Sequence, residues 1–377
     1  MIGLFLYNEV DLNAEIAGGV QICSKEFLSI IKNTVDELHF FKVRHSKSIL
    51  FRILYKLNLD NYLSYQPHHY KQQLKAVLEN NKISHVFINK SELLRFSKLI
   101  KEFQLQTIPK IIIMSHGNES GDLLGNLTNP NSIFNRFYAF FGKIKLGLNL
   151  YTESLYRKNY VDLVCTMSEE ESAIEKWLGI NNPFYISRLI NKEENIIRNP
   201  TKNIFGYVGT LNHTPNILAL TQLFDLLKKT GINSEIRIVG QPIHIGKNLE
   251  AKYSFVKYLG GLKDDELLLE VKNWKYFINP IFYYSRGASM KLAKAIEWQI
   301  PIITTIAGKR GYVWQEGSLI ETGNTPIEFA NEMLKLESDS IHYNTLAIEI
   351  NKIKQSTPTA LQQGKKLRAL LTGNPFI

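Results

Sequence analysis

The segment from Phe277 to Thr305 constrains the fold of this chain more than any other stretch. Its flanks, Tyr276–Asn279 and Ile300–Thr304, are short apolar runs of the kind that buried parallel strands show. Apolar residues between the flanks recur at helical spacing, and Pro301 ends that helix. The segment therefore predicts a strand, a turn, a helix and a second strand, which is the repeating unit of a doubly wound α/β domain.

The turn of this unit has the features of a phosphate site. It contains three small residues, Ser285, Gly287 and Ser289, which let backbone N–H groups converge on a ligand at the start of the helix. Lys291 adds a cation in the first helical turn. Exposed amides and a cation at a helix N-terminus favour phosphate binding. The alternative is a plain capping turn, because most Gly/Ser turns before helices only cap them.

The pattern Gly287-x-x-x-Lys291-x-x-Lys294, followed by Pro301 and a Thr-rich strand, resembles the donor-site signature of retaining glycosyltransferases of family 4, which have the GT-B fold. In that family the pattern is roughly Gly-x-x-x-Lys-x-x-Glu-Ala, followed by Gly-x-Pro. This chain departs from it at two positions. The Glu that is usually taken to hold the nucleotide ribose is Lys294 here, and the Gly before the proline is Gln299.

The resemblance implies a set of donor-binding and catalytic residues. Arg286 stands where many relatives carry a Glu that contacts the donor sugar, so it is a candidate for the sugar or the phosphates. Glu297 is the nearest candidate for the carboxylate that is lost at position 294. The candidate donor-binding residues are Gly18, Gly19, Gly209, Thr210, Gly240, Gly287, Ser289, Met290, Lys291, Lys294 and Glu297, and the candidate catalytic residues are His116, Lys291 and Arg286.

The length of 377 residues suits two domains, because it exceeds what one ordinary hydrophobic core supports. The hydrophobic content of 44% and the charged content of 21% are those of a globular protein. A polar stretch around Pro200 separates two series of alternating strands and helices. We predict a GT-B fold with two doubly wound Rossmann-like domains facing a central cleft: an acceptor-side domain (1–195), a linker (196–203), a nucleotide-sugar-binding domain (204–357) and a C-terminal helix (358–377) that returns to the first domain.

The first half places a histidine where doubly wound domains have their sites. Ile2–Tyr7 followed by Gly18-Gly19 and a helix predicts the opening of such a domain, although a Gly-Gly pair is more often a simple turn. The strand Ile111–Met114 ends shortly before His116, at the carboxyl edge of the predicted sheet. His116 is a turn residue or a site residue by position alone. In family 4 a histidine at a similar position faces the acceptor and the donor sugar.

The second half repeats this pattern with two further landmarks. Gly209-Thr210 follows a strand and precedes a Pro-Asn helix start, and Gly240 follows the strand Glu235–Val239. With the Gly287–Lys291 turn they follow one another in the order seen in a subgroup of the same family. Amides at Ser289 and Met290 with the Lys291 ammonium stabilise a departing diphosphate, so we expect no metal and no cofactor besides the donor substrate.

The net charge of +10 is concentrated in two sections, Arg44 to Lys56 and Phe134 to Lys158. We expect residues 118–131 to form a long loop before a helix whose aromatic stripe has cations on its rim. Such a stripe is either core or part of a contact with anionic membrane or acidic polysaccharide; we favour a peripheral membrane contact at which a lipid-linked acceptor is presented. No nucleic-acid-binding motif accompanies the charge.

The remaining features place the chain in the cytoplasm, with the peripheral contact on the inner face of the cytoplasmic membrane. No apolar run approaches the ~18 residues of a membrane-spanning helix. The first seven residues lack a basic leader and predict a strand instead of a signal peptide. Two cysteines, Cys23 and Cys165, fit a reducing compartment and exclude a disulfide scaffold or a zinc cluster.

The function that we expect is transfer of a sugar from a nucleotide diphosphate donor to a glycan or lipid-linked acceptor in surface polysaccharide biosynthesis. The resemblance implies a retaining reaction. One alternative is a nucleotide-sugar 2-epimerase, which shares the GT-B fold but needs acid/base residues beyond His116. Another is a non-catalytic GT-B partner subunit, which the departures at Lys294 and Arg286 favour.

Overall fold

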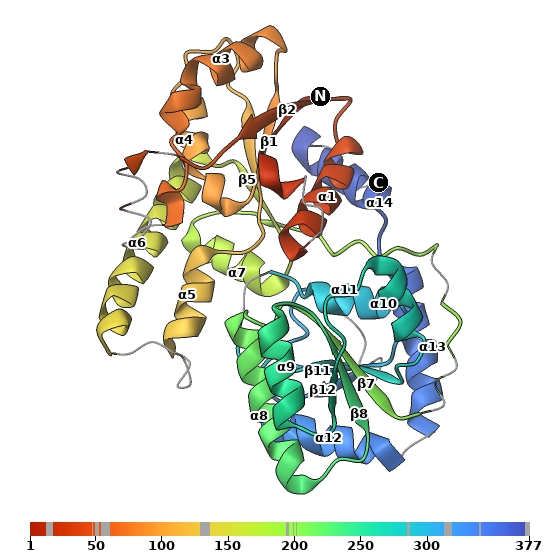
Figure 1. Cartoon of the computed structure of the whole chain (residues 1–377). Coiled ribbons are helices and arrows are strands. Elements are labelled where there is room, and N and C mark those ends of the chain that lie inside the picture. Colours follow the sequence, from red (N-terminus) through yellow and green to blue (C-terminus); the bar gives the residue numbers. More distant parts are fainter. Residues whose placement is uncertain are drawn as a thin grey trace. The chain divides into compact units, whose positions relative to one another are not determined.

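The computed structural model describes residues 1–12, 18–46, 48–49, 53, 61–128, 136–193, 196–198, 200, 202–284, 287–312, 319–338 and 341–373. Ser285, Arg286 and part of the predicted basic section from Arg44 to Lys56 lie outside these residues. The chain forms two compact units (Figure 1). Unit 1 comprises Met1–Arg188 and Pro358–Ile377, and unit 2 comprises Leu189–Thr357.

Unit 1 is built on one parallel sheet. Its strands are β1 (Ile2–Asn8), β2 (Glu37–Val43), β3 (His85–Asn89), β4 (Lys110–Met114), β5 (Leu163–Thr166) and β6 (Phe184–Tyr185). They lie in the order β2-β1-β3-β4-β5-β6, and every neighbouring pair is parallel. The chain places β2 on one side of β1 and the later strands on the other, so the strand order reverses between β1 and β3.

Helices flank this sheet. They are α1 (Gly19–Lys32), α3 (Lys71–Asn80), α4 (Arg95–Lys101), α5 (Glu119–Thr128), α6 (Arg136–Tyr160), α7 (Glu169–Leu178) and α14 (Ala360–Thr372), with short 3-10 helices η1 (Glu9–Asp11), η2 (Asn61–Leu63), η3 (Pro67–Tyr70) and η4 (Ser91–Leu93). The predicted long loop from Asn118 to Asn131 is wrong where α5 forms. Acidic residues in its first turn, Glu119 and Asp122, favour that helix because they face the positive end of its dipole.

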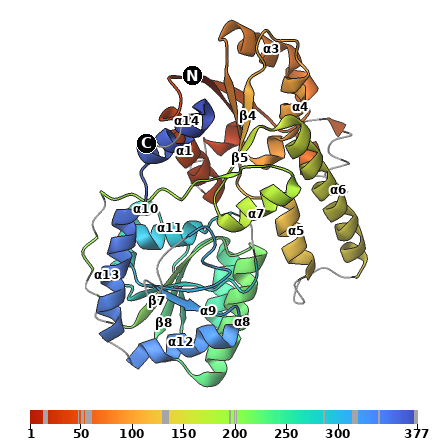
Figure 2. The same cartoon turned by 180° about the vertical axis from the view of Figure 1, so that it is seen from behind.

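Unit 2 repeats the architecture. Its strands are β7 (Ile204–Val208), β8 (Glu235–Val239), β9 (Val256–Tyr258), β10 (Tyr276–Asn279), β11 (Ile302–Thr305) and β12 (Ile320–Thr322), in the all-parallel order β12-β11-β10-β7-β8-β9. The strand order reverses between β7 and β10. The helices are α8 (Thr214–Thr230), α9 (Ile243–Lys252), α10 (Asp264–Val271), α11 (Met290–Glu297), α12 (Pro326–Ser338) and α13 (Ile341–Ser356) (Figure 2).

The central strands of both units are largely buried on both faces, whereas the edge strand β2 has exposed residues. All four residues of β10 and all four of β11 are buried, as the apolar runs of the sequence predict for parallel strands under helices. Close packing is visible at Gly206 in β7, where a Cβ atom would lie 1.8 Å from the ring of Trp274. The central sheets therefore hold their strand ends rigidly, which fixes the loops that follow them.

The C-terminal helix α14 belongs to unit 1, as predicted. It lies beside α1 (Figure 1), and at Gly364 the two helices approach so closely that a Cβ atom would lie 2.6 Å from Cβ of Asn33. Arg368 forms two hydrogen bonds to the carboxylate of Asp36, at 2.7 and 3.1 Å. Both ends of the described chain are thus anchored in one unit.

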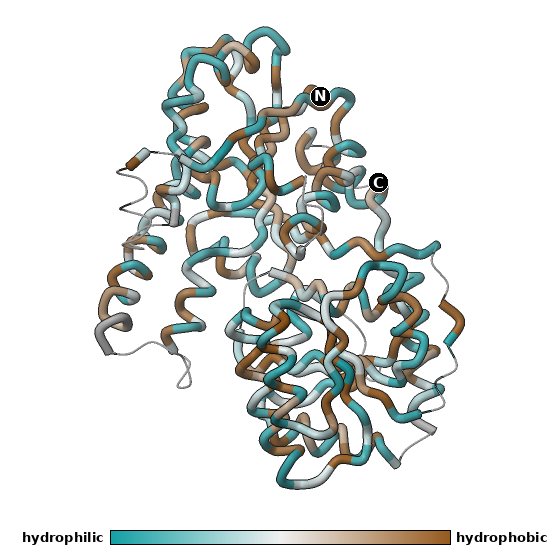
Figure 3. The backbone as a smooth tube through the Cα atoms, in the orientation of Figure 1, coloured by the Kyte–Doolittle hydropathy of each residue, from teal (hydrophilic) through white to brown (hydrophobic). Residues whose placement is uncertain are grey.

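Helix α6 is inverted with respect to an ordinary amphipathic helix. Its buried row is polar and consists of Lys145, Asn149, Glu153 and Arg157, spaced four residues apart. Its exposed row is apolar and consists of Phe140, Ile144, Leu148, Tyr151 and Leu155. Lys145, which we expected among the exposed cations beside the aromatic stripe, is only 7% exposed, so that expectation is wrong. The hydrophobic colouring recurs along the helix (Figure 3).

Buried charges on α6 are satisfied within unit 1. The Arg157 guanidinium donates to both carboxylate oxygens of Glu175, at 2.8 and 2.9 Å, and to Oδ1 of Asn118 at 2.8 Å. The Glu153 carboxylate accepts from the Tyr62 hydroxyl at 2.5 Å and from the Ser120 amide at 3.1 Å. Ion pairing and hydrogen bonding offset part of the cost of burying these charges, which lets the polar side of α6 face inward.

Candidate functional site

The carboxyl edge of the unit 2 sheet, where the strand order reverses between β7 and β10, is the first candidate site. The loop after β7 leads into α8 and the loop after β10 leads into α11, so both helix starts meet at this edge. Open α/β sheets bind their ligands at such switch points. The sequence places Gly209, Thr210, Gly287 and Lys291 on these two connections.

Lys291 joins the two connections. Its ammonium donates to Oδ1 of Asn216 at 2.8 Å and to the Tyr207 hydroxyl at 3.4 Å, and it lies 5.0 Å from the centre of the Tyr207 ring. Asn216 in turn donates from Nδ2 to the carbonyl oxygen of Thr210 at 2.8 Å. The amide of Asn216 therefore positions the cation of α11 against the loop that follows β7.

The hydrogen bonds of Lys291 do not neutralise its charge. Both partners of Lys291 are neutral side chains, and a second cation, Arg310, acts on it electrostatically. Burial, together with the positive charge of Arg310, lowers the pKa of Lys291 to about 7. Burial and the same two cations lower the pKa of His213, which precedes α8. Cations that lower one another's pKa values favour the binding of an anion between them.

The first turn of α11 is built as expected, with one difference. Gly287 has a φ of 71°, a backbone conformation that favours glycine, and it sets the direction of the turn before the helix. The Ser289 amide, which we expected to face the ligand, donates to the carbonyl oxygen of Arg310 at 3.4 Å. Its own carbonyl oxygen accepts from the Tyr312 hydroxyl at 2.7 Å. The amides of the first helical turn, from Met290 onward, are then the group that a phosphate would meet.

Lys294 and Glu297 lie further along α11. They form an ion pair in which the Lys294 ammonium is 3.1 Å from each carboxylate oxygen of Glu297. Glu297 is also the last residue of α11, about 10 Å along the axis from Met290 at 1.5 Å per residue. The structure thus pairs these two candidates with each other and does not bring the Glu297 carboxylate to Lys291.

Gly209 and Gly240 are in contact through their backbones. A Cβ atom on Gly240 would lie 1.9 Å from the carbonyl oxygen of Gly209, so no other residue fits at position 240 without moving the loop. The Gly240 amide donates to the carbonyl of Gly260 at 2.8 Å. Gly240 therefore supports the loop that carries Gly209 and Thr210 by close packing.

The second candidate site is the carboxyl edge of the unit 1 sheet, at the switch point between β1 and β3. His116, which follows β4, lies with its Nε2 3.0 Å from Oδ1 of Asn89 at the end of β3. The Asn89 amide donates from Nδ2 to Asp11 at 3.1 Å and to Ser24 at 2.9 Å. Lys90 forms an ion pair with Asp11 at 2.7 Å. His116 is therefore the outer member of a buried, hydrogen-bonded row.

The remaining unit 1 candidates, Gly18 and Gly19, lie at the exposed start of α1. Gly18 caps the helix with extended backbone, and neither glycine has a positive φ. Residues 13–17, which precede them, lie outside the described part of the chain.

Sequence reasoning missed several residues that the structure brings to these edges. In unit 2 they are Tyr207, Asn216 and Arg310, and in unit 1 they are Asp11 and Asn89. Asn216 had a signal, because it follows the proline that begins α8. Asn89 had a weaker one, as a polar residue that ends an apolar strand.

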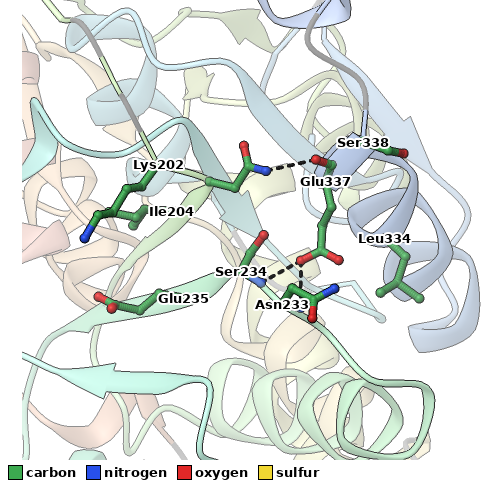
Figure 4. Close-up of a pocket in the computed structure, with 9 residues that line it drawn as sticks. Lys202, Ile204, Asn233, Ser234, Glu235, Leu334, Glu337 and Ser338 are labelled. Carbon is green, nitrogen blue, oxygen red and sulfur yellow. Dashed lines mark hydrogen bonds between the residues drawn. The ribbon is translucent and has the colours of Figure 1, made fainter.

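A cavity of ≈650 Å³ lies elsewhere in unit 2 (Figure 4). Ile204 and Glu235 in its wall are the first residues of β7 and β8, so it opens at the sheet edge opposite to the switch point. The Glu337 carboxylate accepts from the amides of Asn233 and Ser234 at 3.0 and 2.6 Å and so closes one side. This cavity takes no part in the candidate site. Within the described residues, no group of three or more His, Cys, Asp or Glu side chains is arranged to hold a metal ion.

Comparison with known proteins identifies the fold. Residues 202–339 match the family model described as glycosyl transferases group 1. No curated protein sequence matches the chain. Among solved structures, a sucrose-phosphate synthase from Thermosynechococcus elongatus is similar at 15% identity with a TM-score of 0.68, covering 99% of this chain and 100% of that one.

Two further structures are similar over the same extent. HepE of Anabaena in complex with UDP-glucose has 12% identity and a TM-score of 0.67, and the lipopolysaccharide outer core galactosyltransferase WaaB has 13% identity and a TM-score of 0.63. Each covers 99% of this chain and 100% of its own. The whole chain therefore has the predicted GT-B fold, and residues 202–339 of its second unit are similar to glycosyl transferases group 1.

Proposed function

We propose that this protein is a glycosyltransferase that takes a sugar from a nucleotide diphosphate donor and transfers it to a glycan or lipid-linked acceptor of a surface polysaccharide. The group 1 domain at residues 202–339 supports glycosyl transfer. HepE, a structural neighbour, was solved with UDP-glucose bound, which supports a nucleotide-sugar donor. We include retention of the anomeric configuration because the Gly287–Lys294 pattern resembles that of retaining enzymes.

The observation that carries the proposal is the charge of Lys291 at the unit 2 switch point, because its two hydrogen-bond partners are neutral side chains. When a glycosidic bond to a diphosphate breaks, negative charge develops on the departing phosphate while the sugar becomes cationic. Lys291, Arg310 and the start of α11 supply positive potential at one place, and the partners of Lys291 are neutral. Preorganised charges of this kind stabilise a developing anion without reorganisation.

The lowered pKa of Lys291 fits this role. With a pKa of about 7 in the free protein, the ammonium is only partly protonated near neutral pH. A bound diphosphate stabilises the protonated form and raises that pKa, so binding takes up a proton. The site then gains its full charge when the ligand is present.

In unit 1 we assign the sugar-transfer end of the reaction to His116. It is the outermost member of the polar row at the switch point, and it is only partly buried. An imidazole at the carboxyl edge of the sheet offers a hydrogen bond to a hydroxyl group of the sugar or of the acceptor.

A ligand screen tests the proposed function. Purified protein is heated with UDP, GDP or ADP and with their sugar conjugates, and unfolding is followed by fluorescence. A ligand at ~100 times its dissociation constant adds about 2.7 kcal/mol to stability, so the matching nucleotide raises the melting temperature clearly. Sugar transfer or donor hydrolysis with the same nucleotide supports an enzyme. Nucleotide binding without turnover of any conjugate favours the non-catalytic partner subunit, and a change of the sugar at C2 favours the epimerase. No stabilisation by any nucleotide contradicts all three.

The inverted helix α6 supports a membrane-presented acceptor. Its exposed row is apolar, Lys143 and Lys158 on it are exposed, and its one acidic residue, Glu153, is buried. An apolar ridge with cations and no exposed carboxylate fits the surface of an anionic bilayer, into which such a face lies without spanning. No helix in the described part of the chain is long and apolar enough to cross a membrane.

Vesicle sedimentation tests this contact. We expect binding to vesicles with phosphatidylglycerol, weaker binding with added salt, and little binding to pure phosphatidylcholine. Lys143→Glu with Lys158→Glu lowers the affinity, since each basic residue near the surface contributes about 1 kcal/mol. Lys75→Glu on α3, a half-exposed lysine of unit 1, is the control and leaves binding nearly unchanged. Vesicle binding that does not depend on salt, or no vesicle binding at all, contradicts the proposed membrane contact.

A further inference from the structure

The polar row behind His116 is built around one buried amide. The Asn89 side chain is 0% exposed, Asp11 is 1% exposed and Ser24 is 0% exposed. Asn89 has two N–H bonds on Nδ2 and uses them on Asp11 and Ser24, at 3.1 and 2.9 Å. Its Oδ1 faces His116 Nε2 at 3.0 Å. All of these groups come from elements at the unit 1 switch point: η1, α1, β3 and the turn after β4.

The orientation of the Asn89 amide is decided by Asp11. A carboxylate oxygen only accepts hydrogen bonds, so it requires the N–H₂ end of Asn89 to face it. The reversed amide would place Oδ1 against the carboxylate, two acceptors in a buried site, at the cost of an unmade hydrogen bond. Ser24 does not decide the orientation, because a hydroxyl both donates and accepts.

Lys90 supports the charge on Asp11. Its ammonium lies 2.7 Å from Oδ1 of Asp11, and this residue has a φ of 80°, an uncommon conformation for any residue but glycine. Burial raises the pKa of Asp11, and the Lys90 ammonium acts in the opposite direction. A backbone held in a rare conformation beside a buried ion pair is the kind of local strain that accompanies functional sites.

We propose that Asp11 and Asn89 are positioning residues that hold neutral His116 in the tautomer with its proton on Nε2. The Asn89 oxygen can only accept, so Nε2 must donate to it. The lone pair then lies on Nδ1, and His116 acts on its ligand as a hydrogen-bond acceptor. The ligand group that it recognises is therefore a hydrogen-bond donor, which in a sugar or glycan acceptor is a hydroxyl.

This assignment rests on the proposed function only in naming a sugar or acceptor hydroxyl as the partner of Nδ1. The tautomer itself follows from the hydrogen bonds of unit 1. The tautomer assignment and the proposed function can therefore fail separately, because the test measures the tautomer without using enzyme activity.

The test is a long-range ¹⁵N–¹H spectrum of protein labelled at its 9 histidines, recorded at a pH of about 8.5, about two units above the ordinary histidine pKa. The signal of His116 is assigned by its loss in His116→Gln. We expect one tautomer, with Nε2 in the chemical-shift range of a protonated nitrogen and Nδ1 in that of an unprotonated one. A predominant Nδ1–H tautomer in the unmodified protein overturns the proposal.

Asp11→Asn is the informative variant. An amide at position 11 both donates and accepts, so it no longer dictates which way Asn89 faces, and we expect both tautomers of His116 to appear. Ser24→Ala is the matched control: it removes the other acceptor of Asn89 Nδ2 and keeps Asp11, so the Nε2–H tautomer persists. An unchanged single tautomer in folded Asp11→Asn overturns the role of Asp11. If Asp11→Asn does not fold, the spectrum of the unmodified protein still decides the proposal.

Activity provides a second readout. With the donor found in the ligand screen, Asp11→Asn lowers kcat by about tenfold, the size of one well-placed hydrogen bond, and leaves the affinity for the nucleoside diphosphate unchanged. Ser24→Ala has a kcat within about twofold of the unmodified protein. Equal losses in both variants indicate a purely structural role and overturn the positioning role. If no donor is turned over at all, the proposed function fails while the tautomer result stands.

Discussion

The two switch points of this protein treat charge in opposite ways. In unit 1 the buried carboxylate of Asp11 is matched by the ammonium of Lys90, and a neutral amide carries the influence of that pair outward to His116. In unit 2 the ammonium of Lys291 is held by a neutral amide and a phenol, with a second cation nearby. One edge balances its charges internally, and the other leaves a positive excess.

The difference indicates what each edge is prepared to bind. A positive excess beside a helix start is costly until an anion arrives, so unit 2 is suited to a diphosphate. A balanced row that ends in an imidazole attracts no ion, so unit 1 is suited to an uncharged hydroxyl group. The same fold, used twice, thus supplies an electrostatic site and a hydrogen-bonding site.

Lys291→Ala removes the cation of the unit 2 switch point and has the largest expected effect. Loss of a charge-assisted contact to phosphate costs about 1.5 to 3 kcal/mol, which weakens binding of the nucleoside diphosphate about 10- to 150-fold. Isothermal titration calorimetry measures this. Lys294→Ala, three residues along α11, is the control, because its ammonium is already engaged by Glu297. Equal affinities for Lys291→Ala and the unmodified protein would remove the donor site from this edge.

His116→Ala removes the proposed hydrogen-bonding group of unit 1 and leaves the proposed diphosphate site of unit 2 unchanged. We expect kcat to fall by about tenfold while the affinity for the nucleoside diphosphate stays the same, because the lost hydrogen bond is made to the reacting partner. Steady-state kinetics and calorimetry on the same preparation separate the two quantities. His69→Ala, an exposed histidine of the same unit, should match the unmodified protein. A normal kcat would return His116 to the role of a turn residue.

The pH dependence of nucleoside diphosphate binding tests whether the charge of Lys291 determines affinity in unit 2. The Lys291 ammonium, with a pKa of about 7 in the free protein, is charged below that pH and loses its proton above it. Because the diphosphate binds the charged form, affinity is full below about pH 7 and falls by about fivefold between pH 7 and pH 8. Lys291→Arg, which stays charged, should remove this decline. Equal slopes for the two proteins would show that another group titrates.

Gln299→Gly tests a position outside both edges and has the smallest expected effect. Gln299 follows α11 with a φ of 57°, where the family pattern has glycine. Glycine relieves the strained backbone conformation of the folded state, but it also gives the unfolded chain more freedom. The two effects partly cancel, so the free energy of unfolding rises by less than about 1 kcal/mol. Urea unfolding measures it, with Gln299→Ala as the control that keeps the strained conformation. A change in nucleotide affinity would contradict the independence of this position.

Local features of the candidate site were predictable, and long-range ones were not. The turn at Gly287 and the cation at Lys291 lie within one helix start, so their spacing in the sequence is enough to predict them. Asn216 meets Lys291 only because β7 and β10 are neighbours in the sheet, although the two residues are 75 positions apart. Asn89 and His116 meet for the same reason across β3 and β4. The order of strands in the sheet decides which distant residues meet, and local patterns in a single sequence do not reveal that order.

Helix α6 shows a different limit. Its apolar period predicts an amphipathic helix, and the usual assumption is that the apolar side faces the core. The polar side is buried instead, because Glu153 and Arg157 find partners on other elements of unit 1. Periodicity identifies the two faces of a helix, and the available partners decide which one turns inward.

The packing of α14 on α1 has a consequence for how the protein is made. Asp36 and Arg368 are 332 positions apart, so unit 1 lacks its last helix until nearly the whole described chain has been synthesised. Unit 2 is continuous in sequence and can complete its sheet earlier. During translation the sheet of unit 2 can therefore be completed before α14 packs on α1 of unit 1. Synthesis of α14, and not emergence of the first strands, sets the moment at which unit 1 becomes complete.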